Sequence, residues 1–540
     1  MAYFNCNLQL NWFLYKFMAN ELLIPIEASG ANMGTQPRVQ RRLGGNRAAL
    51  FVYAMEGLEN MAFVANAVSL VTYFFGYMNF SLTKSATTLT NFLGTAFLLA
   101  LVGGLISDTY LSRFKTCVLF ACMELLGYGI LTVQARFHQL RPIPCKDLAP
   151  TQMSQCEAAT GGHAAILYTG LYLVALGTGG IKAALPALGA DQFDEKDPKE
   201  AAQLSSFFNW FLFSLTIGAI IGVTFIVWIG VNLGWDWSFI VCTLTILFAI
   251  VFICMGNSLF FDRAAIARSS TGAATNSGPW RLCTVTQVEE TKILIRMLPI
   301  IVSTIFMNTC LAQLQTFTIQ QSTTMNTNLG GFKVPGPSVP VIPLMFMFVL
   351  IPLYDRVFVP LARRITGIPT GIRHLQRIGI GLVLSAVSMA VAGFVETHRK
   401  SVAIKHNMVD SREPLPISVF WLGFQYAIFG AADMFTLIGL LEFFYAESSA
   451  GMKSLGTAIS WCSVAFGYFT STVVVEVVNK VSGGWLANNN LNRDNLNYFY
   501  WLLSVLSVVN FGFYLVCASW YRYKTVENEQ DDSKDNVDMA

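Results

Sequence analysis

About a dozen long apolar stretches divide this chain, and they limit its fold more than any other feature does. Each is long enough to cross a bilayer, which takes about 20 apolar residues in a helix. They lie near 48–76, 85–107, 114–135, 162–186, 205–230, 235–258, 291–322, 339–362, 374–396, 415–445, 454–479 and 497–521. Only 12% of the 540 residues are charged, whereas soluble domains carry about 25%. Lipid must cover such a surface, so we expect an all-α membrane protein.

The spacing of the spans predicts two halves with six helices each. We expect one six-helix bundle over 47–258 and a second over 291–523. A short cytosolic linker at 259–290 would join them, with a cytosolic N-terminal segment at 1–46. The tail at 524–540 is acidic and polar, which is typical of disorder.

Basic residues in the short loops orient the predicted bundles. Loops rich in Lys and Arg stay in the cytosol, and this rule places both termini of a multi-pass protein there, with the plasma membrane as the default location. One loop disagrees, because His398, Arg399, Lys400 and Lys405 would lie outside. The basic residues that support the assignment are Arg41, Arg42, Arg47, Arg113, Lys115, Arg263, Arg268, Arg281, Arg363, Arg364, Arg373, Arg377, Arg522 and Lys524.

Two acids lie inside the first apolar stretch, at Glu56 and Glu59. A charge at the centre of a membrane helix costs roughly 2.5–3.5 kcal/mol, so each needs a partner, water or a function. Residues three apart share a helical face, and two carboxylates in a medium of low polarity favour keeping a proton on one of them. The pair therefore predicts proton coupling. The alternative is a structural pair neutralised by a cation from another helix.

The other charges inside apolar stretches include Lys182 in the fourth and Asp433 in the tenth. Lys182 follows two glycines, where helices approach closely. A pair between Lys182 and Asp433 would neutralise both charges, and it would break when solute or a proton arrives. A static ion pair is the alternative. Glu124 and Glu476 show no evident partner, so we interpret them as helix-end or cavity-wall carboxylates.

A polar turn follows the second apolar stretch, with Asp108 five residues before Arg113. Charges at helix ends can hold neighbouring helices together. The turn resembles the loop signature of the major facilitator superfamily, in which it serves gating. We therefore assign a gating role to Asp108 and Arg113.

Several segments in order resemble the plant nitrate/peptide transporter family, the eukaryotic arm of the proton-coupled oligopeptide transporters. The likeness covers nearly the whole chain, and the segments at 59–63 and 311–314 are most similar to its fourth subfamily. The segments that carry it are Asn-Phe-Leu-Gly-Thr at 91–95, the turn at 104–115, Leu-Gly-Thr-Gly-Gly-Ile-Lys at 176–182, Asp-Gln-Phe-Asp at 191–194, Ser-Phe-Phe-Asn-Trp-Phe at 206–211, Leu-Gln-Arg-Ile-Gly at 375–379 and Asn-Tyr-Phe-Tyr-Trp-Leu at 497–502.

The resemblance implies a major facilitator fold, alternating access and a proton-coupling motif Glu-x-x-Glu-Arg/Lys. Glu56 and Glu59 match this motif, but Asn60 stands where the cation belongs. Losing the cation makes the acids easier to protonate and removes a local charge switch. Lys182 and Asp433 match the family's lysine and acid on the fourth and tenth helices, although the acid there is usually Glu.

A second departure concerns the solute. Members that bind nitrate can carry a His on the seventh helix, where this chain has Leu311, an apolar residue that cannot donate to nitrate. The linker between the halves is also much shorter than is usual in the family. Residues expected to line a central cavity are Glu56, Glu59, Lys182, Asn308, Gln313, Asp433 and Trp461.

The expected function is secondary active transport of a small anionic or polar solute by proton symport. Candidates are nitrate or a carboxylate hormone such as abscisic acid or gibberellin, whose carboxylate Lys182 would hold. The alternatives are a di- or tripeptide symporter, and a sensor that binds solute but transports it weakly. We expect no enzyme activity, metal site or cofactor beyond the proton. A net charge of +3 gives no hint of a nucleic-acid partner, and a homodimer stays open.

Overall fold

The computed structural model describes residues 45–80, 82–142, 158–193, 198–256, 285–329, 332–333, 340–368, 370–410, 413–449, 451–486 and 491–521. These ranges are nearly all helical, and 12 helices in them are long and apolar enough to cross a membrane. The helices between Gly45 and Met255, and those from Ile293 to Trp520, belong to one compact unit. The predicted all-α membrane fold is confirmed.

The first half of the chain contains six spans, two of which are interrupted. Leu99 separates α3 from α4, and a π-helical turn at Gly222–Ile226 joins α7 to α8. The helices are α2 (Gly45–Gly76), α3 (Leu82–Leu98), α4 (Ala100–Thr109), α5 (Arg113–Arg136), α6 (Gly161–Ala190), α7 (Pro198–Ile221), α8 (Val227–Asn232) and α9 (Trp235–Met255).

The second half repeats this count of six spans. A π-helical turn at Tyr354–Phe358 interrupts its second span, between Pro352 and Pro360, and proline removes a backbone donor from a helix. The helices are α11 (Val285–Thr324), α12 (Val341–Leu353), α13 (Val359–Thr366), α14 (His374–Lys405), α15 (Leu422–Glu447), α16 (Lys453–Ser482) and α17 (Leu496–Trp520).

Some predicted boundaries were wrong. The tenth span begins at Val419, with α15 following from Leu422, because Leu415–Ser418 forms a short strand, β4, that pairs in parallel with β1 at Met325–Asn326. Pro416 disfavours a helix at that point. Two further short strands, β2 (Asn328–Leu329) and β3 (Phe332–Lys333), pair with each other. Helix α14 runs nine residues past its predicted end at 396, to Lys405.

The predicted segments outside the bundles are mostly beyond the described residues. This applies to 1–44, to the linker up to residue 284, and to the tail from 524. The linker predicted at 259–290 does overlap α11, which begins at Val285.

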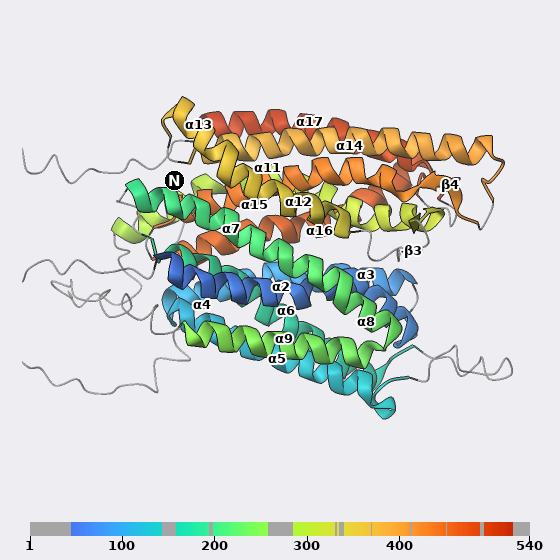
Figure 1. The fold of residues 1–540 in the computed structure, drawn as a ribbon, viewed down its shortest axis with the longest axis horizontal. Helices are drawn as coiled ribbons and strands as arrows, with labels where there is room; N and C mark the ends of the chain where they lie inside the picture. Colours follow the sequence, from blue (N-terminus) through green and yellow to red (C-terminus); the bar gives the residue numbers. More distant parts are fainter. Residues whose placement is uncertain are drawn as a thin grey trace, which may run out of the picture. The chain divides into compact units, whose positions relative to one another are not determined.

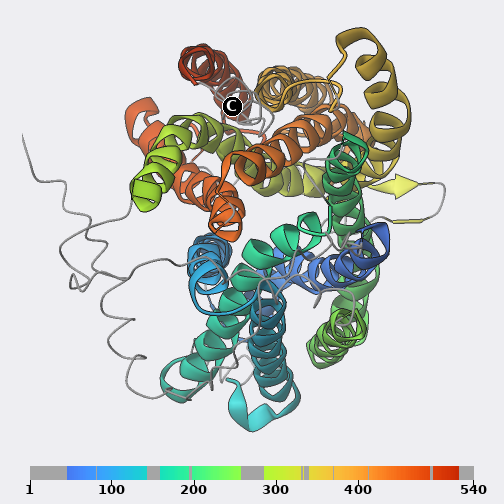
Figure 2. The same ribbon diagram turned by 90° about the vertical axis from the view of Figure 1, so that its left-hand side faces the viewer.

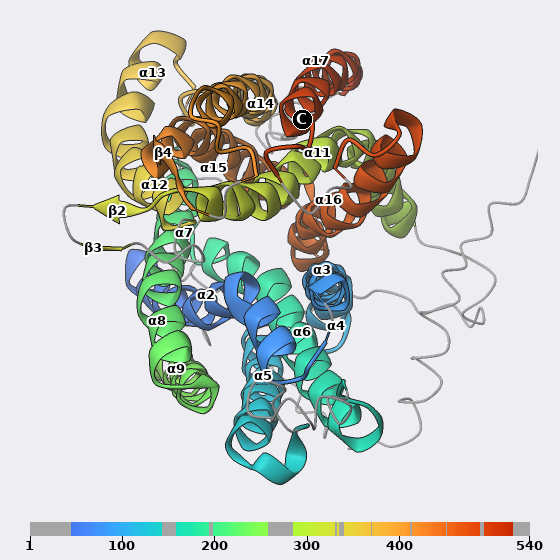
Figure 3. The same cartoon turned by 90° about the vertical axis from the view of Figure 1, so that its right-hand side faces the viewer.

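The helices of the two halves lie roughly alongside one another (Figure 1). Helix α16 packs against α3, α4 and α6 of the first half, and α12 packs against α7. We call the end of the bundle that contains the last turn of α4 and the first turn of α16 the Asp108 end. Figure 2 views the molecule from this end and Figure 3 from the opposite one.

The basic residues that disagreed with the predicted orientation lie in the last turns of α14 rather than in a loop, and one of them is an internally paired arginine. Arg399 is fully buried, and its guanidinium donates to Glu396 Oε2 at 2.8 Å and Oε1 at 2.7 Å. Lys400 donates to the carbonyl of Asp494 at 2.7 Å. A neutralised arginine adds no net charge to its side of the membrane, so it is weak evidence against the orientation given by the other loops.

Candidate functional site

Lys182 of α6 lies between the two acids of α2. Its ammonium is 3.1 Å from Glu59 Oε2 and 3.6 Å from Glu56 Oε1. The lysine side chain is 2% exposed and both acids are fully buried. A charge group this deeply buried is expensive unless it is paired, so the lysine and the acids stabilise one another. The sequence predicted all three as site residues, and the structure brings them together.

Local sequence explains how α6 delivers this lysine. Gly103 of α4 faces Gly180 of α6 so closely that a Cβ on Gly103 would lie 2.4 Å from the Gly180 Cα. Close approach of small residues is how membrane helices pack tightly. Four residues from Thr178, one turn further along α6, Lys182 extends toward α2, and its ammonium lies 5.4 Å from the centre of the Phe63 ring.

Glu124 of α5, which we interpreted as a helix-end or cavity-wall carboxylate with no evident partner, lies in the middle of its helix and belongs to the same cluster. It is fully buried, and the Thr178 hydroxyl donates to its Oε1 at 3.2 Å. Glu59 and Lys182 are close enough to interact with it electrostatically. The apolar surroundings of Glu124 in the sequence gave no sign of this, because its partners come from α2 and α6. Glu476, by contrast, lies exposed on α16.

The expected ion pair between Lys182 and Asp433 is absent, since Lys182 is held by α2. Asp433 is half-buried on α15 and forms no ion pair or hydrogen bond with any other described residue. It lies near Tyr468 of α16, whose hydroxyl donates to Gln315 Oε1 at 2.7 Å. The two charges are thus kept apart, each on its own half.

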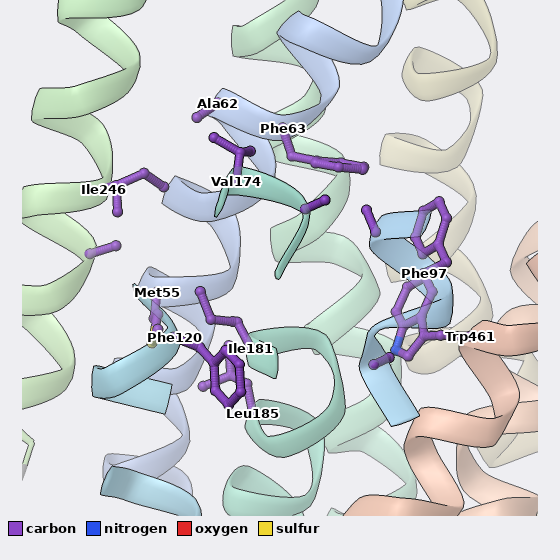
Figure 4. Close-up of a cluster of buried hydrophobic side chains, with 14 of the residues drawn as sticks. Met55, Ala62, Phe63, Phe97, Phe120, Val174, Ile181, Leu185, Ile246 and Trp461 are labelled. Carbon is purple, nitrogen blue, oxygen red and sulfur yellow. The ribbon is translucent and has the colours of Figure 1, made fainter. Parts of the chain in front are cut away.

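Trp461 of α16 connects the second half to the lysine. Its indole N–H donates to the Lys182 backbone carbonyl at 3.1 Å, and its ring centre is 5.2 Å from the ammonium. The ring also stacks on Phe97 of α3, with centroids 5.6 Å apart and planes at 10°. Figure 4 shows these two rings side by side within the buried apolar cluster. The sequence predicted Trp461 at the site, but not this bond.

The two predicted amide residues lie between α11 and α16. Asn308 donates to Ser463 Oγ at 2.8 Å, and Gln313 donates to Ser471 Oγ at 2.8 Å and to its carbonyl at 2.9 Å. These amide donors already hold two helices of the same half together. Their contact with a solute stays a prediction.

The structure also shows what occupies the two positions where the chain departs from the family pattern. Asn60 donates to the Leu215 carbonyl of α7 at 2.9 Å, so it joins helices where the motif would supply a cation. Leu311 is half-buried and packs against the apolar core of the second half.

Asp108 and Arg113 join the two halves at the Asp108 end. The Asp108 carboxylate accepts from the backbone N–H of Leu455 at 2.7 Å and of Ser454 at 3.3 Å, at the N-terminus of α16. An anion is favoured there by the unpaired N–H groups and the helix dipole. Arg113 pairs with Asp191 and donates to Ser454 Oγ at 2.9 Å. The turn predicted as a gate thus contacts the opposite half.

A second network joins the halves and was missed by sequence reasoning. Arg377 of α14 donates to Glu442 Oε2 at 3.0 Å and to Asn209 Oδ1 at 2.7 Å, and Asn209 donates to Asp355 Oδ1 at 2.8 Å. Ser206 and Trp210, on the same helix as Asn209, also donate to Asp355. Arg377 and the three residues on α7 belong to segments quoted above for the family resemblance, whereas Glu442 and Asp355 do not, and the spacing of these residues alone indicates no mutual contact.

These cross-half contacts are all toward one end of the bundle. Side-chain hydrogen bonds join described residues of the first half to described residues of the second. They lie between the Asp108 end and the level of Asn209 and Trp461. Trp461 is eight residues from Lys453, where α16 begins, and Asn209 is 11 from Pro198, where α7 begins. The halves are therefore locked together by polar contacts at the Asp108 end.

Solved structures of similar fold are membrane transporters. The chain covers 99% of a crystal structure of the POT family transporter PepTSo with a TM-score of 0.62 and 16% identity, over 88% of its own length. It covers 98% of an auto-inhibited POT family peptide transporter with a TM-score of 0.61 and 16% identity, over 89% of its own length. Together with the 12 spans, these likenesses define the class of the protein as a multi-pass membrane protein with the fold seen in POT family transporters.

Sequence relatives then identify the family. The POT family model matches residues 114–270 and 262–491. Among Arabidopsis thaliana proteins, the chain is 42% identical to Protein NRT1/PTR FAMILY 4.6, over 92% of this chain and 97% of the relative. It is 44% identical to Protein NRT1/PTR FAMILY 4.5, over 91% and 96%. The chain belongs to the POT family, and its predicted likeness to the fourth plant subfamily is confirmed.

Proposed function

We propose that this chain is a proton symporter that carries a small organic anion or nitrate by alternating access. The observation that carries the proposal is Lys182, a buried cation held by Glu59 and Glu56. A buried ammonium is the group in the described part of the site that can bind an anion, and it is occupied by carboxylates that can take protons instead.

The coupling follows from charge balance among these groups. A proton on Glu59 removes the charge that holds Lys182 most closely, at 3.1 Å. The ammonium is then available to a solute anion. Conversely, an anion on Lys182 deprives the two acids of their cation, which favours their protonation. Proton and solute therefore help one another to bind, and this coupling must be reciprocal.

The conformation supports a place in the transport cycle. If the basic loops mark the cytosol, the Asp108 end is the cytosolic end, and its Asp108, Arg113 and Arg377 contacts close that side. Opening requires these contacts to break while the bundle rocks around the fixed site. On the same basis we propose that both termini are cytosolic, and we take the plasma membrane as the default location.

The solute class is an organic acid with an apolar body, such as abscisic acid or gibberellin, with nitrate close behind. Lys182 lies among the aromatic rings of Phe63 and Trp461, which suit an apolar body next to a carboxylate. For nitrate, Lys182 supplies charge but Leu311 supplies no donor.

A di- or tripeptide is the second candidate. Asp433 of the other half forms no ion pair or hydrogen bond with a described residue. A carboxylate on one half and an ammonium on the other would suit the two ends of a zwitterion. A sensor with weak transport is the third, because Asn60 replaces the motif's cation.

An uptake panel tests the proposal. The chain is expressed in oocytes and assayed with nitrate, abscisic acid, gibberellin and a dipeptide at acid and neutral external pH. We expect faster uptake of at least one anion at acid pH. Uptake of the dipeptide alone would replace the anion by a peptide. Binding of a probe without uptake would identify a sensor.

A further inference from the structure

We propose that Glu124 is a third proton-binding carboxylate of this site and shares its proton with Glu59 through the hydroxyl of Thr178. This inference rests on the proposed proton symport and deepens it, because it adds an exchangeable proton that the two acids on α2 do not account for. It arises from the junction of α5, α6 and α2, where the three acidic side chains meet a single lysine.

The first observation is the depth at which Glu124 is held. Its carboxyl is fully buried, and a Cβ placed on Gly177 would lie 2.5 Å from the Glu124 Cβ. No side chain fits at position 177 without moving Glu124, so the glycine lets α6 approach and presents Thr178 to the acid. The second carboxyl oxygen, Oε2, has no hydrogen-bond partner among the described residues. A fully buried carboxylate with an unsatisfied oxygen is unstable as an anion.

The second observation is that Thr178 lies beside both acids. It donates to Glu124 Oε1 at 3.2 Å, while Glu59 Oε1 is a buried oxygen without a hydrogen-bond partner among the described residues. A hydroxyl has one proton to donate and can accept another. It can therefore satisfy both acids only when one of them carries a proton and donates it to the Thr178 oxygen. The bridge is complete with one proton shared over Glu59 and Glu124.

A proton can cross this bridge without leaving a charge on the threonine. When protonated Glu59 gives its proton to Thr178 Oγ1, the hydroxyl passes its own proton to Glu124, and the hydroxyl is restored. The start and end states each contain one carboxylate and one carboxylic acid. Glu124 is thus a place where the proton can reside while Glu59 is ionised and paired with Lys182.

The third observation is the charge balance. Three buried carboxylates at Glu56, Glu59 and Glu124 meet one ammonium, that of Lys182, with no second cation paired to them among the described residues. Fully ionised, the group would carry two uncompensated negative charges in a medium where such charges are expensive. Protons are the simplest neutralisers. The titratable groups on the packed helices that interact with these three acids are Cys117 and Tyr128 of α5, Cys242 of α9 and Lys182 of α6, and of these only Lys182 is a cation.

The direct test counts protons on the purified full chain without any solute. The pH-dependent infrared band of protonated carboxylic acids and the proton uptake of unbuffered protein are measured for the wild type, Glu124→Gln and Glu476→Gln. We expect Glu124→Gln to lose one component of the band and about one exchangeable proton per molecule. The exposed Glu476 serves as the control and should change neither the buried component nor its midpoint. An unchanged band and proton count in Glu124→Gln would overturn the proposal.

The bridge is tested by two variants of Thr178. Thr178→Val keeps the shape and removes the hydroxyl, whereas Thr178→Ser keeps it. We expect Thr178→Val to shift the pH midpoint of the Glu124 component, and Thr178→Ser to stay at the wild-type midpoint. Equal midpoints in both would show that Glu124 titrates without Thr178 and would overturn the shared proton. If Glu124→Gln does not fold, this pair still decides the question.

Failure of the symport proposal would give a different pattern. If no solute in the uptake panel is transported but the Glu124 component is present, the proton site stands and symport falls. If a solute is transported and the component is absent, symport stands and the third proton site falls.

Discussion

The indole N–H of Trp461 donates to the backbone carbonyl of Lys182 at 3.1 Å. The bond crosses from α16 of the second half to α6 of the first half. The second half thus holds Lys182, the residue whose side chain we assign to solute binding. Without this bond, the carbonyl of Lys182 would accept only from the backbone of its own helix. Any rocking of the halves that separates α16 from α6 must break it.

We expect Trp461→Phe to favour separation of the halves at the Asp108 end. Phe keeps an apolar ring against Phe97 but has no N–H to donate. One such hydrogen bond is worth about 0.5–1.5 kcal/mol, which is roughly a two- to tenfold change in population. The measurement is the labelling rate by a thiol reagent of a cysteine introduced as Ser107→Cys, a buried position that contacts Ser454.

Labelling is compared with that of the parent chain without the introduced cysteine, in vesicles exposing the Asp108 end. Trp501→Phe is the matched control, because Trp501 packs on Phe394 of α14 within the second half. Equal labelling of the wild type and Trp461→Phe would show that the bond does not restrain the closed form.

We expect Glu59→Gln to abolish uptake driven by an inward proton gradient, with the protein still present at the membrane. Gln has the same shape and can donate to a neighbour, but it cannot bind and release a proton. Glu56→Gln should have a smaller effect, because Glu56 is 3.6 Å from Lys182 and Glu59 is 3.1 Å from it. Uptake is measured at acid and neutral pH, with Glu476→Gln as the control. Full activity of Glu59→Gln with unchanged pH dependence would show that Glu59 has no role in proton coupling.

The fold was predictable from the sequence because lipid leaves so few alternatives. A span must bury its backbone polar groups within a helix, so apolar length alone gave all 12 spans. The ends were less certain. The strand at Leu415–Ser418 forms with a partner at Met325–Asn326, about 90 residues away in the chain, and no local pattern reports such a partner.

The site was predictable in its residues but not in its pairs. Glu56, Glu59 and Lys182 are conspicuous because ionisable residues inside apolar stretches are costly. Their pairing depends on how far α6 can approach α2 and α4, which the glycines set. The close approach of α6 pairs Lys182 with Glu59, whereas complementary charge alone had suggested a pair with Asp433. Glu124 was undervalued for the same reason, since Thr178 reaches it only in the packed helix pair.

We expect Lys182→Ala to lose anion uptake and to become less stable as the pH rises. Without the ammonium, the acids at 56, 59 and 124 must be protonated to be buried in the folded chain. In the unfolded chain they are exposed to water and ionised at neutral pH. The folded state then binds more protons, and stability falls with increasing pH. The measurement is the thermal unfolding midpoint in detergent at several pH values, together with uptake. Retained uptake with normal affinity would reduce the lysine to a packing role.

The matched control for that pH series is Glu59→Gln with Lys182→Ala. Removing one acid along with the lysine takes away one of the charges that would have to be buried. We expect the double variant to recover part of the midpoint at neutral pH, because residues in contact do not act additively. A midpoint for Lys182→Ala that does not depend on pH would show that the folded variant binds no more protons than the unfolded chain, and it would contradict this prediction.

We expect Arg377→Met to destabilise the fold and Arg377→Met with Glu442→Leu to restore much of the loss. Arg377 is 2% exposed and Glu442 is 4% exposed in their ion pair at 3.0 Å. Removing one partner of a buried pair costs about 3–5 kcal/mol, whereas replacing both with apolar groups is often neutral. His374 also lies beside this pair, with its Nδ1 3.5 Å from Glu442 Oε2.

The thermal unfolding midpoint in detergent measures this effect, and Arg493→Met is the control. Arg493 also pairs closely with an acid, Asp410, but the two side chains are 56% and 65% exposed. Water screens such a pair, so its loss should leave the midpoint unchanged. Because the Arg377 network also joins α14 to Asn209 of the first half, the double variant should be stable yet label faster at Ser107→Cys. Slow labelling in a stable double variant would mean that the Asp108 contacts alone keep the two halves closed.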